Sequence, residues 1–228
     1  MTLDDILQDL RRQSSDPKHA ETGIWVAAVL RDRIAAGQLA PGAKLSEQAL
    51  SEVLSVSRNT LREAFSTLAS EHVVVRIPNR GVYVARPSAD DIREMYRVRR
   101  FLEPAALLWS PAGDTAPLHA AVARAREARE AGSVSEMADA NQKFHAALVA
   151  LTGSERLVLQ MTQVLAEMRL VFHSMVADGG FHAPYIERNA RMLDLLDAGF
   201  RTEAAELMTE YLHRAESQLL AAVAHPCT

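Results

Sequence analysis

The spacing of apolar residues predicts three helices near the start of the chain. Between Thr22 and Ala36 apolar side chains recur every three or four residues, which predicts a helix that ends at Gly37. Two shorter periodic segments follow, and Ser46 and Ser57 are placed to cap their N-termini. The last of the three helices has an apolar stripe made of Leu61, Ala64, Phe65 and Leu68.

The period then changes from helical to extended. Val73–Ile77 and Val82–Val84 are rich in β-branched residues, and the intervening Pro78–Gly81 has the composition of a turn, so a small hairpin is predicted. Three helices followed by a hairpin is the order of elements in a winged helix-turn-helix. We therefore predict such a DNA-binding domain at residues 21–86, after a flexible lead-in at 1–20.

Behind Pro87-Ser88 the pattern is helical throughout. Glycines divide it into six predicted helices, at about 89–110, 115–131, 134–151, 155–177, 183–198 and 201–223. Ser133 and Glu136 have the spacing of a capping box at the start of the third. The predicted fold is mainly α, with the winged helix-turn-helix followed by a six-helix antiparallel bundle at 87–228.

Composition fits two cytoplasmic domains. The 228 residues are 48% hydrophobic, which is enough for two cores. Cys227 is the only cysteine, so a disulfide within the chain is excluded. The acidic N-terminus does not resemble a signal peptide, and no apolar run reaches the roughly 20 residues that span a membrane. We expect a cytoplasmic protein with no membrane segment.

The net charge of -4 conceals an uneven distribution. Residues 55–86 contain five arginines and two glutamates, a local charge of +3, whereas from Pro87 onward 14 basic residues face 19 acidic ones. A basic segment thus precedes an acidic one, which favours nucleic-acid binding by the first.

One face of the third predicted helix has the chemistry of DNA recognition. Arg58, Asn59 and Arg62 lie opposite its apolar stripe, three or four residues apart. Arginine contacts phosphates or guanine, and asparagine contacts adenine or a phosphate. Ser57 is at the N-terminus that would enter the groove, and Arg80 is at the tip of the wing. Two arginines alone are more often solvated surface residues. The prediction of DNA binding therefore depends on the order of elements, three helices followed by a hairpin.

Two motifs resemble the GntR family of bacterial regulators. These are Gly42–Glu47 (GAKLSE) and Val56–Ala64 (VSRNTLREA), and Arg80–Val84 (RGVYV) resembles the wing of that family. Gln48 replaces a basic residue found in several members, which leaves the operator sequence open. The resemblance implies DNA contacts at Gln48, Ser57, Arg58, Asn59, Arg62, Asn79, Arg80 and Gly81.

Polar residues interrupt the apolar stripes of four predicted bundle helices. They are Arg99, Asn141, His145, Asn189 and Tyr211. An unpaired buried polar group costs about 1–3 kcal/mol, so five of them in one interior suggest a shared ligand, water cluster or ion. Two structural alternatives stay open: Arg99 can form an i, i+4 ion pair with Glu103, and His145 can be a satisfied core histidine.

The bundle resembles the FCD effector domain of the FadR subfamily, in its shorter VanR-like form. Arg99-x-x-x-Glu103 and Phe144-His145-x-x-Leu148 carry this resemblance. It implies a small-molecule cavity that in many members holds a divalent metal, bound by Asp or Asn and three His. Those ligands would fall on Asn141, His145, Asn189 and Tyr211.

Only one of these four positions is a histidine, so we expect no metal cofactor, with Asn141 and His145 as weak candidate ligands. Amides and a protonated phenol are poor ligands for zinc or nickel. We expect instead an organic effector, small and anionic. Its carboxylate would pair with Arg99, and further contacts would come from Asn141, His145, Arg169, Asn189 and Tyr211.

Enzyme activity is not expected. The chain has one Glu210-x-x-His213 spacing without the second that a di-iron bundle needs, and it lacks a phosphate loop, a zinc-protease motif and a nucleophile elbow. The predicted function is that of a ligand-responsive transcription repressor, a homodimer that binds a two-fold symmetric operator in double-stranded DNA. The alternative is a DNA-binding protein whose bundle only dimerises.

Overall fold

The computed structural model describes residues 23–111, 113–174 and 181–224, which form two compact units. The first contains the residues up to Pro87 together with Arg169–Ser174, and the second contains Ser88–Met168 and the described residues from 181 onward. The predicted lead-in at 1–20 lies outside the described residues.

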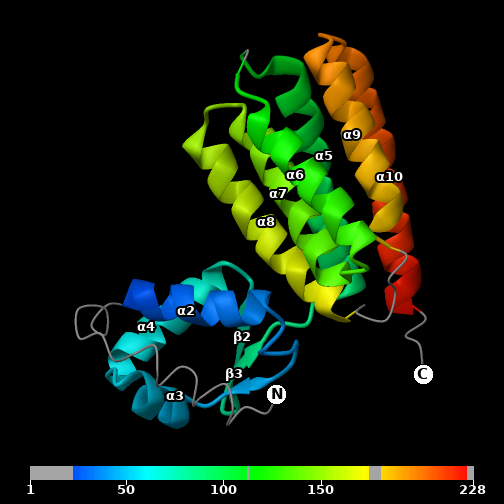
Figure 1. Ribbon diagram of the computed structural model, residues 1–228. Coiled ribbons are helices and arrows are strands. Elements are labelled where there is room, and N and C mark those ends of the chain that lie inside the picture. The colour runs from blue at the N-terminus through cyan, green and yellow to red at the C-terminus, as the bar shows by residue number, and fades with distance from the viewer. Residues whose placement is uncertain (1–22, 112, 175–180, 225–228) are drawn as a thin grey trace. The chain divides into compact units, whose positions relative to one another are not determined.

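The first unit has the predicted order of three helices and a hairpin (Figure 1). Ser46 and Ser57 cap α3 and α4 as predicted, since their side chains accept hydrogen bonds from the backbone N–H groups of Ala49 and Thr60. Its elements are α2 (Gly23–Ala35), β1 (Lys44–Leu45), α3 (Glu47–Leu54), α4 (Arg58–Ser70), β2 (Val74–Ile77) and β3 (Gly81–Val84).

The sheet of this unit contains a strand that the sequence did not predict. Its order is β1-β3-β2, with both pairs antiparallel, and β1 pairs Lys44 with Tyr83. A two-residue strand has no periodicity of its own, and it forms because β3 offers a free edge. The pairing of Ile77 with Gly81 sets the length of the turn in the wing.

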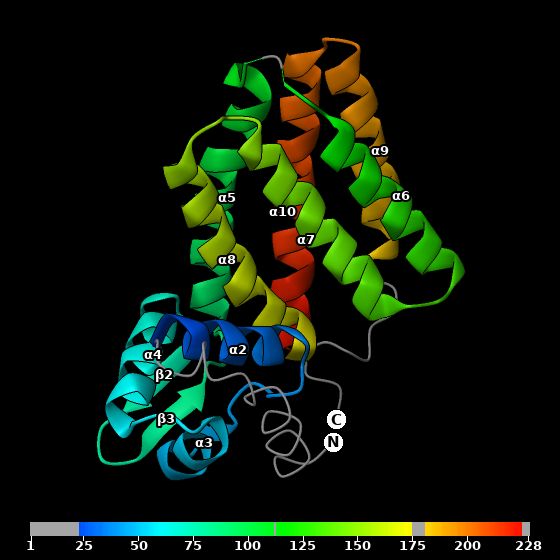
Figure 2. The ribbon, with the colours of Figure 1, turned by 60° about the vertical axis from the view of Figure 1, so that its left-hand side comes forward.

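The second unit is the predicted six-helix bundle (Figure 2). The described helix ends are close to those expected, and the predicted end at residue 177 lies outside the described residues. Helix α10 packs along α5, and α6 packs along α7 and α9. No described helix is long and apolar enough to cross a bilayer. The helices are α5 (Ala89–Trp109), α6 (Ala116–Glu130), α7 (Val134–Ala150), α8 (Glu155–Ser174), α9 (Ala183–Asp197) and α10 (Arg201–Ala224).

The capping box predicted at Ser133 is wrong. Ser133 is the N-cap residue of α7, but its side chain makes no capping hydrogen bond. The carboxylate of Glu136 lies 3.2 Å from Arg124 on α6, and this ion pair draws it away from the helix end. A capping box does form at α5, where Ser88 and Asp91 bond reciprocally.

Candidate functional site

The N-terminal half of α4 presents the residues predicted to contact DNA. Arg58 and Asn59 occupy its first turn with exposed side chains. The hydroxyl of Ser57 accepts from the backbone N–H of Thr60 at 3.0 Å and lies 2.8 Å from the Thr60 hydroxyl. Ser57 therefore positions the helix end, while the next two side chains are free to reach bases or phosphates.

Arg62 is joined to the helix before it. Its Nε atom donates to Oε2 of Glu47 on α3 at 3.2 Å, and both side chains remain partly exposed. Such an exposed pair contributes little stability, so the guanidinium can exchange the carboxylate for a phosphate. Gln48, also on α3, is exposed and donates to Glu52 at 3.2 Å.

Sequence reasoning did not single out Arg76 of β2. Its Nη2 atom donates to the backbone oxygen of Arg62 at 2.6 Å and to Oγ of Ser66 at 2.8 Å. Arg76 thus ties β2 to α4 and adds a cation beside Arg62. The outward position of Arg76 in an alternating strand was the available signal.

The turn of the wing holds Arg80 at its tip. Asn79 has a φ of 62° and Gly81 a φ of 109°, so both adopt backbone conformations that most residues avoid. The backbone oxygen of Arg80 accepts from the Tyr83 hydroxyl at 3.2 Å. These contacts fix the turn and leave the Arg80 side chain exposed.

In the bundle, the five polar residues predicted to face inward lie together around Glu103. Nε of Arg99 donates to Oε1 of Glu103 at 2.5 Å, and Nδ1 of His145 lies 2.6 Å from Oε2 of the same carboxylate. On the other side of the imidazole, Nε2 lies 3.0 Å from the Tyr211 hydroxyl.

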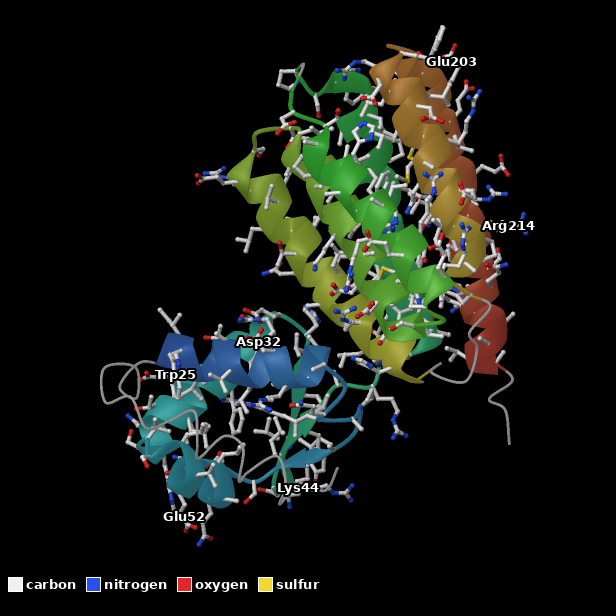
Figure 3. The ribbon with its side chains drawn as sticks, viewed as in Figure 1. Trp25, Asp32, Lys44, Glu52, Glu203 and Arg214 are labelled. Atoms are coloured by element: carbon white, nitrogen blue, oxygen red, sulfur yellow. The ribbon has the colours of Figure 1, made fainter. Side chains whose placement is uncertain are left out.

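The outer face of α10 carries charged side chains instead, since Glu203 and Arg214 point away from the bundle (Figure 3).

Two asparagines complete the cluster. The Tyr211 hydroxyl donates to Oδ1 of Asn141 at 3.1 Å, and Nδ2 of Asn189 donates to the same oxygen at 2.8 Å. These two contacts join α7, α9 and α10, and Arg99 and Glu103 add α5. One continuous network therefore crosses the bundle interior.

The charges within this network are balanced. Burial alone would raise the pKa of Glu103, but the positive charge of Arg99 and the hydrogen bonds from Arg99 and His145 outweigh burial and lower that pKa to about 2. Burial also lowers the pKa of His145, and Arg99 lowers it further against the opposing pull of Glu103. The imidazole is therefore neutral at pH 7, and the Arg99–Glu103 ion pair leaves the cluster with no net charge.

Hydrogen bonding within the cluster is incomplete at two ends. Among the described residues, Nη2 of Arg99 is buried without a partner, and Nη1 donates only to the sulfur of Met168 at 3.2 Å. Oδ1 of Asn189 is likewise buried without a partner. A neutral His145 that donates Nδ1–H to Glu103 has an acceptor at Nε2, so the single Tyr211 proton is shared by two acceptors. The cluster has a spare donor near α5 and lacks a donor near α9.

Arg169, the sixth predicted ligand residue, has a different place. It begins the segment Arg169–Ser174 of α8, which groups with the first unit. Its neighbour Met168 is the α8 residue that contacts Arg99. Met168 lies on the buried apolar stripe of α8 with Met161, Val164 and Leu165, whereas Arg169 is one residue farther along the helix.

The side chains at the family's metal positions do not fit a divalent metal. Both ring nitrogens of His145 already have hydrogen-bond partners, and burial raises the pKa of Tyr211, which keeps the phenol protonated. Asn141 and Asn189 offer only amides. Within the described ranges, no group of three or more His, Cys, Asp or Glu side chains is arranged to hold a metal ion.

Comparison with known proteins identifies both units. Residues 25–84 match the gntR family of bacterial regulatory proteins, and residues 94–214, more than half of the chain, match the FCD domain. A solved GntR structure from Rhodococcus sp. RHA1 is 40% identical, covers 88% of this chain and 98% of its own, and superposes with a TM-score of 0.83.

Two curated relatives are similar over shorter stretches. The Nta operon transcriptional regulator of Aminobacter aminovorans is 31% identical over 57% of this chain and 63% of its own length. The gluconate operon transcriptional repressor of Bacillus subtilis (strain 168) is 42% identical over 37% of this chain, which spans only 34% of the repressor. The chain belongs to the GntR family of bacterial transcription regulators and carries an FCD domain.

Proposed function

We propose that this transcription regulator is a cytoplasmic repressor that binds operator DNA as a homodimer and responds to a small organic anion in its bundle. The observation that carries the effector proposal is the buried Nη2 of Arg99, which has no hydrogen-bond partner in the part of the chain that the structure describes. A buried donor on a charged group costs free energy when unpaired, and a ligand oxygen would remove that cost.

The open ends of the cluster also indicate the ligand chemistry. Arg99 needs an acceptor. Oδ1 of Asn189 needs a donor, and so does one of the two acceptors that share the Tyr211 proton, which are Nε2 of His145 and Oδ1 of Asn141. A ligand carboxylate would supply the acceptor for Arg99, and a ligand hydroxyl or amino group would supply the donor. A small hydroxy- or amino-carboxylate therefore suits the site better than a simple acid.

An effector should raise the melting temperature of the full chain. We expect at least one of glycolate, D-lactate, D-gluconate, citrate or glycine to stabilise it, by about 2.7 kcal/mol at 100 times its Kd. For a chain of this size that is a shift of roughly 5–10 °C, measurable by differential scanning fluorimetry. The uncharged analogues glycolamide and D-sorbitol are the controls, and they should give no shift.

The ion pair between Arg99 and Glu103 determines which substitution can test whether Arg99 binds the effector. Arg99→Ala would leave Glu103 buried and unpaired, which confounds loss of binding with loss of stability. Arg99→Lys keeps the charge but loses the forked Nη groups, so it should abolish the thermal shift and retain operator binding. An unchanged shift in Arg99→Lys would rule out Arg99 as the anchor. No shift with any anion would favour the alternative, a bundle that only dimerises.

We also propose that the effector domain works without a metal. Protein purified without chelator should contain well under one equivalent of zinc or nickel by elemental analysis, because one imidazole and two amides bind these ions weakly. The double variant Asn189→His, Tyr211→His should bind close to one equivalent of Zn²⁺. It places three imidazoles around Asn141, and Glu103 already orients His145 through Nδ1.

Near-stoichiometric metal in the wild type that is lost in His145→Ala would contradict this proposal. Asn189→Ala, Tyr211→Ala is the matched control for the designed site. It removes the same two side chains without adding imidazoles, so it should bind no zinc.

A further inference from the structure

Arg76 of β2 carries a positive charge that no acidic side chain neutralises among the described residues. Its hydrogen-bond partners there are the backbone oxygen of Arg62 and the hydroxyl of Ser66, and both are uncharged. Both bonds come from Nη2, so Nε and Nη1 are left for another acceptor, and the residue is exposed. A guanidinium has five N–H donors and keeps its charge at any physiological pH. Arg76 therefore has charge and donors to offer to an anion.

The two bonds fix the place of this charge. The Ser66 hydroxyl also donates to the Arg62 oxygen, at 2.9 Å, so the three groups form a closed set of hydrogen bonds. A long side chain on a protein surface normally samples many rotamers, and ordering it on binding costs conformational entropy. Arg76 is already ordered against α4, so that cost is reduced for an anion that approaches α4 and β2 from outside.

The position of Arg76 suits a phosphate better than a base edge. It lies where β2 meets α4, close in sequence to the turn of the wing. When a recognition helix enters the major groove and a wing reaches the flanking DNA, a sugar-phosphate strand passes between them. Base contacts come from the N-terminal turn of such a helix, whereas the acceptors of Arg76 belong to its later turns.

The neighbouring arginines also lack an anion. Arg58 and Arg80 have no acidic partner in the part of the chain that the structure describes, and Arg62 pairs with Glu47 in an exposed contact that a phosphate can displace. These three and Arg76 thus share a single carboxylate. Like charges on one surface repel each other unless an anion lies among them, and a DNA strand supplies phosphates at regular intervals.

We propose that Arg76 binds a backbone phosphate of the operator, in addition to the DNA contacts of α4 and the wing turn. This inference rests on the proposed role of α4 as the recognition helix. A charge-assisted hydrogen bond from the guanidinium holds the phosphate. Because phosphates carry no sequence information, the contact strengthens binding to every duplex and sets no preference among bases.

The salt dependence of binding tests the charge of Arg76. Each neutralised phosphate contributes about 0.9 to the slope of log K against log salt concentration. Arg76→Gln removes the charge but keeps an amide that can donate to the Arg62 oxygen. It should weaken binding of the full chain roughly tenfold and reduce the slope by about 0.9 for each Arg76 in the complex, or about 1.8 for a homodimer.

The measurement is fluorescence anisotropy at several KCl concentrations, with an operator selected from a random duplex library and with a scrambled duplex of the same length. The fold-change in Kd should be the same on both duplexes, because a phosphate contact does not depend on sequence.

Two further variants separate the charge from the tie between β2 and α4. Arg76→Lys restores the charge without the guanidinium fork, and it should recover the wild-type slope. Arg86→Gln is the matched control, since Arg86 is also exposed and donates Nη2 to a backbone oxygen, that of Pro41, at 3.2 Å. Arg86 follows β3 at the end opposite the wing turn, so Arg86→Gln should leave the Kd and the slope unchanged.

A wild-type slope in Arg76→Gln, or a reduced slope in Arg76→Lys, would overturn the proposal. A loss of affinity confined to the operator would also overturn it, because that pattern indicates a base contact or a displaced α4. Failure of the recognition-helix assignment is a separate result, in which Arg58→Ala and Arg62→Ala both bind the operator as tightly as wild type.

Discussion

Glu103→Ala is expected to lower the free energy of unfolding by about 3–5 kcal/mol, because it leaves the buried guanidinium of Arg99 without its counter-charge. The substitution also removes the acceptor of His145 Nδ1, so two buried donors lose their partner at once. Urea unfolding followed by circular dichroism measures the change as a lower midpoint with an unchanged slope.

Two controls separate charge from packing. Glu94→Ala on the same helix removes the partner of an exposed arginine, and the loss should stay below about 1 kcal/mol. The double variant Arg99→Met, Glu103→Leu removes both buried charges, and it should recover most of the stability lost in Glu103→Ala. If Glu103→Ala were as stable as the wild type, water would have to reach Arg99 in solution.

Arg58→Ala, Arg62→Ala is expected to weaken operator binding at least 100-fold. Each arginine makes a charge-assisted contact worth about 1–3 kcal/mol, so either single variant should lose at least tenfold. The operator is first selected from a random duplex library with wild-type protein, and affinities are then compared by fluorescence anisotropy at one salt concentration, since phosphate contacts are salt-dependent.

The control for this variant is Arg93→Ala, an exposed arginine at the start of α5, which should bind the operator as tightly as wild type. Arg80→Ala should have a smaller effect than either α4 variant, chiefly on sequences that flank the half-sites. Unchanged affinity in both Arg58→Ala and Arg62→Ala would show that α4 is not the recognition helix.

Local sequence signals were sufficient to predict most of the architecture. Helix periodicity, the capping serines 46 and 57, and the turn Pro78–Gly81 act over a few residues, so each can be recognised without knowledge of the fold. The inward positions of Asn141, His145, Asn189 and Tyr211 also followed from the helical period. Helix register is preserved along a helix, and it carries each side chain to a definite face.

Contacts between elements could not be predicted from the sequence, because partners that are distant along the chain compete for the same side chain. Glu136 fits a capping box locally, yet Arg124 on another helix holds its carboxylate. Strand β1 exists only because β3 pairs with it, and Arg76 gained a role only when β2 came to lie beside α4. The sequence left two interpretations of Arg99 open, a ligand contact and an ion pair with Glu103. Tertiary packing decided that Glu103 neutralises Arg99 while Nη2 stays unpaired, because burial excludes the water that would otherwise satisfy both.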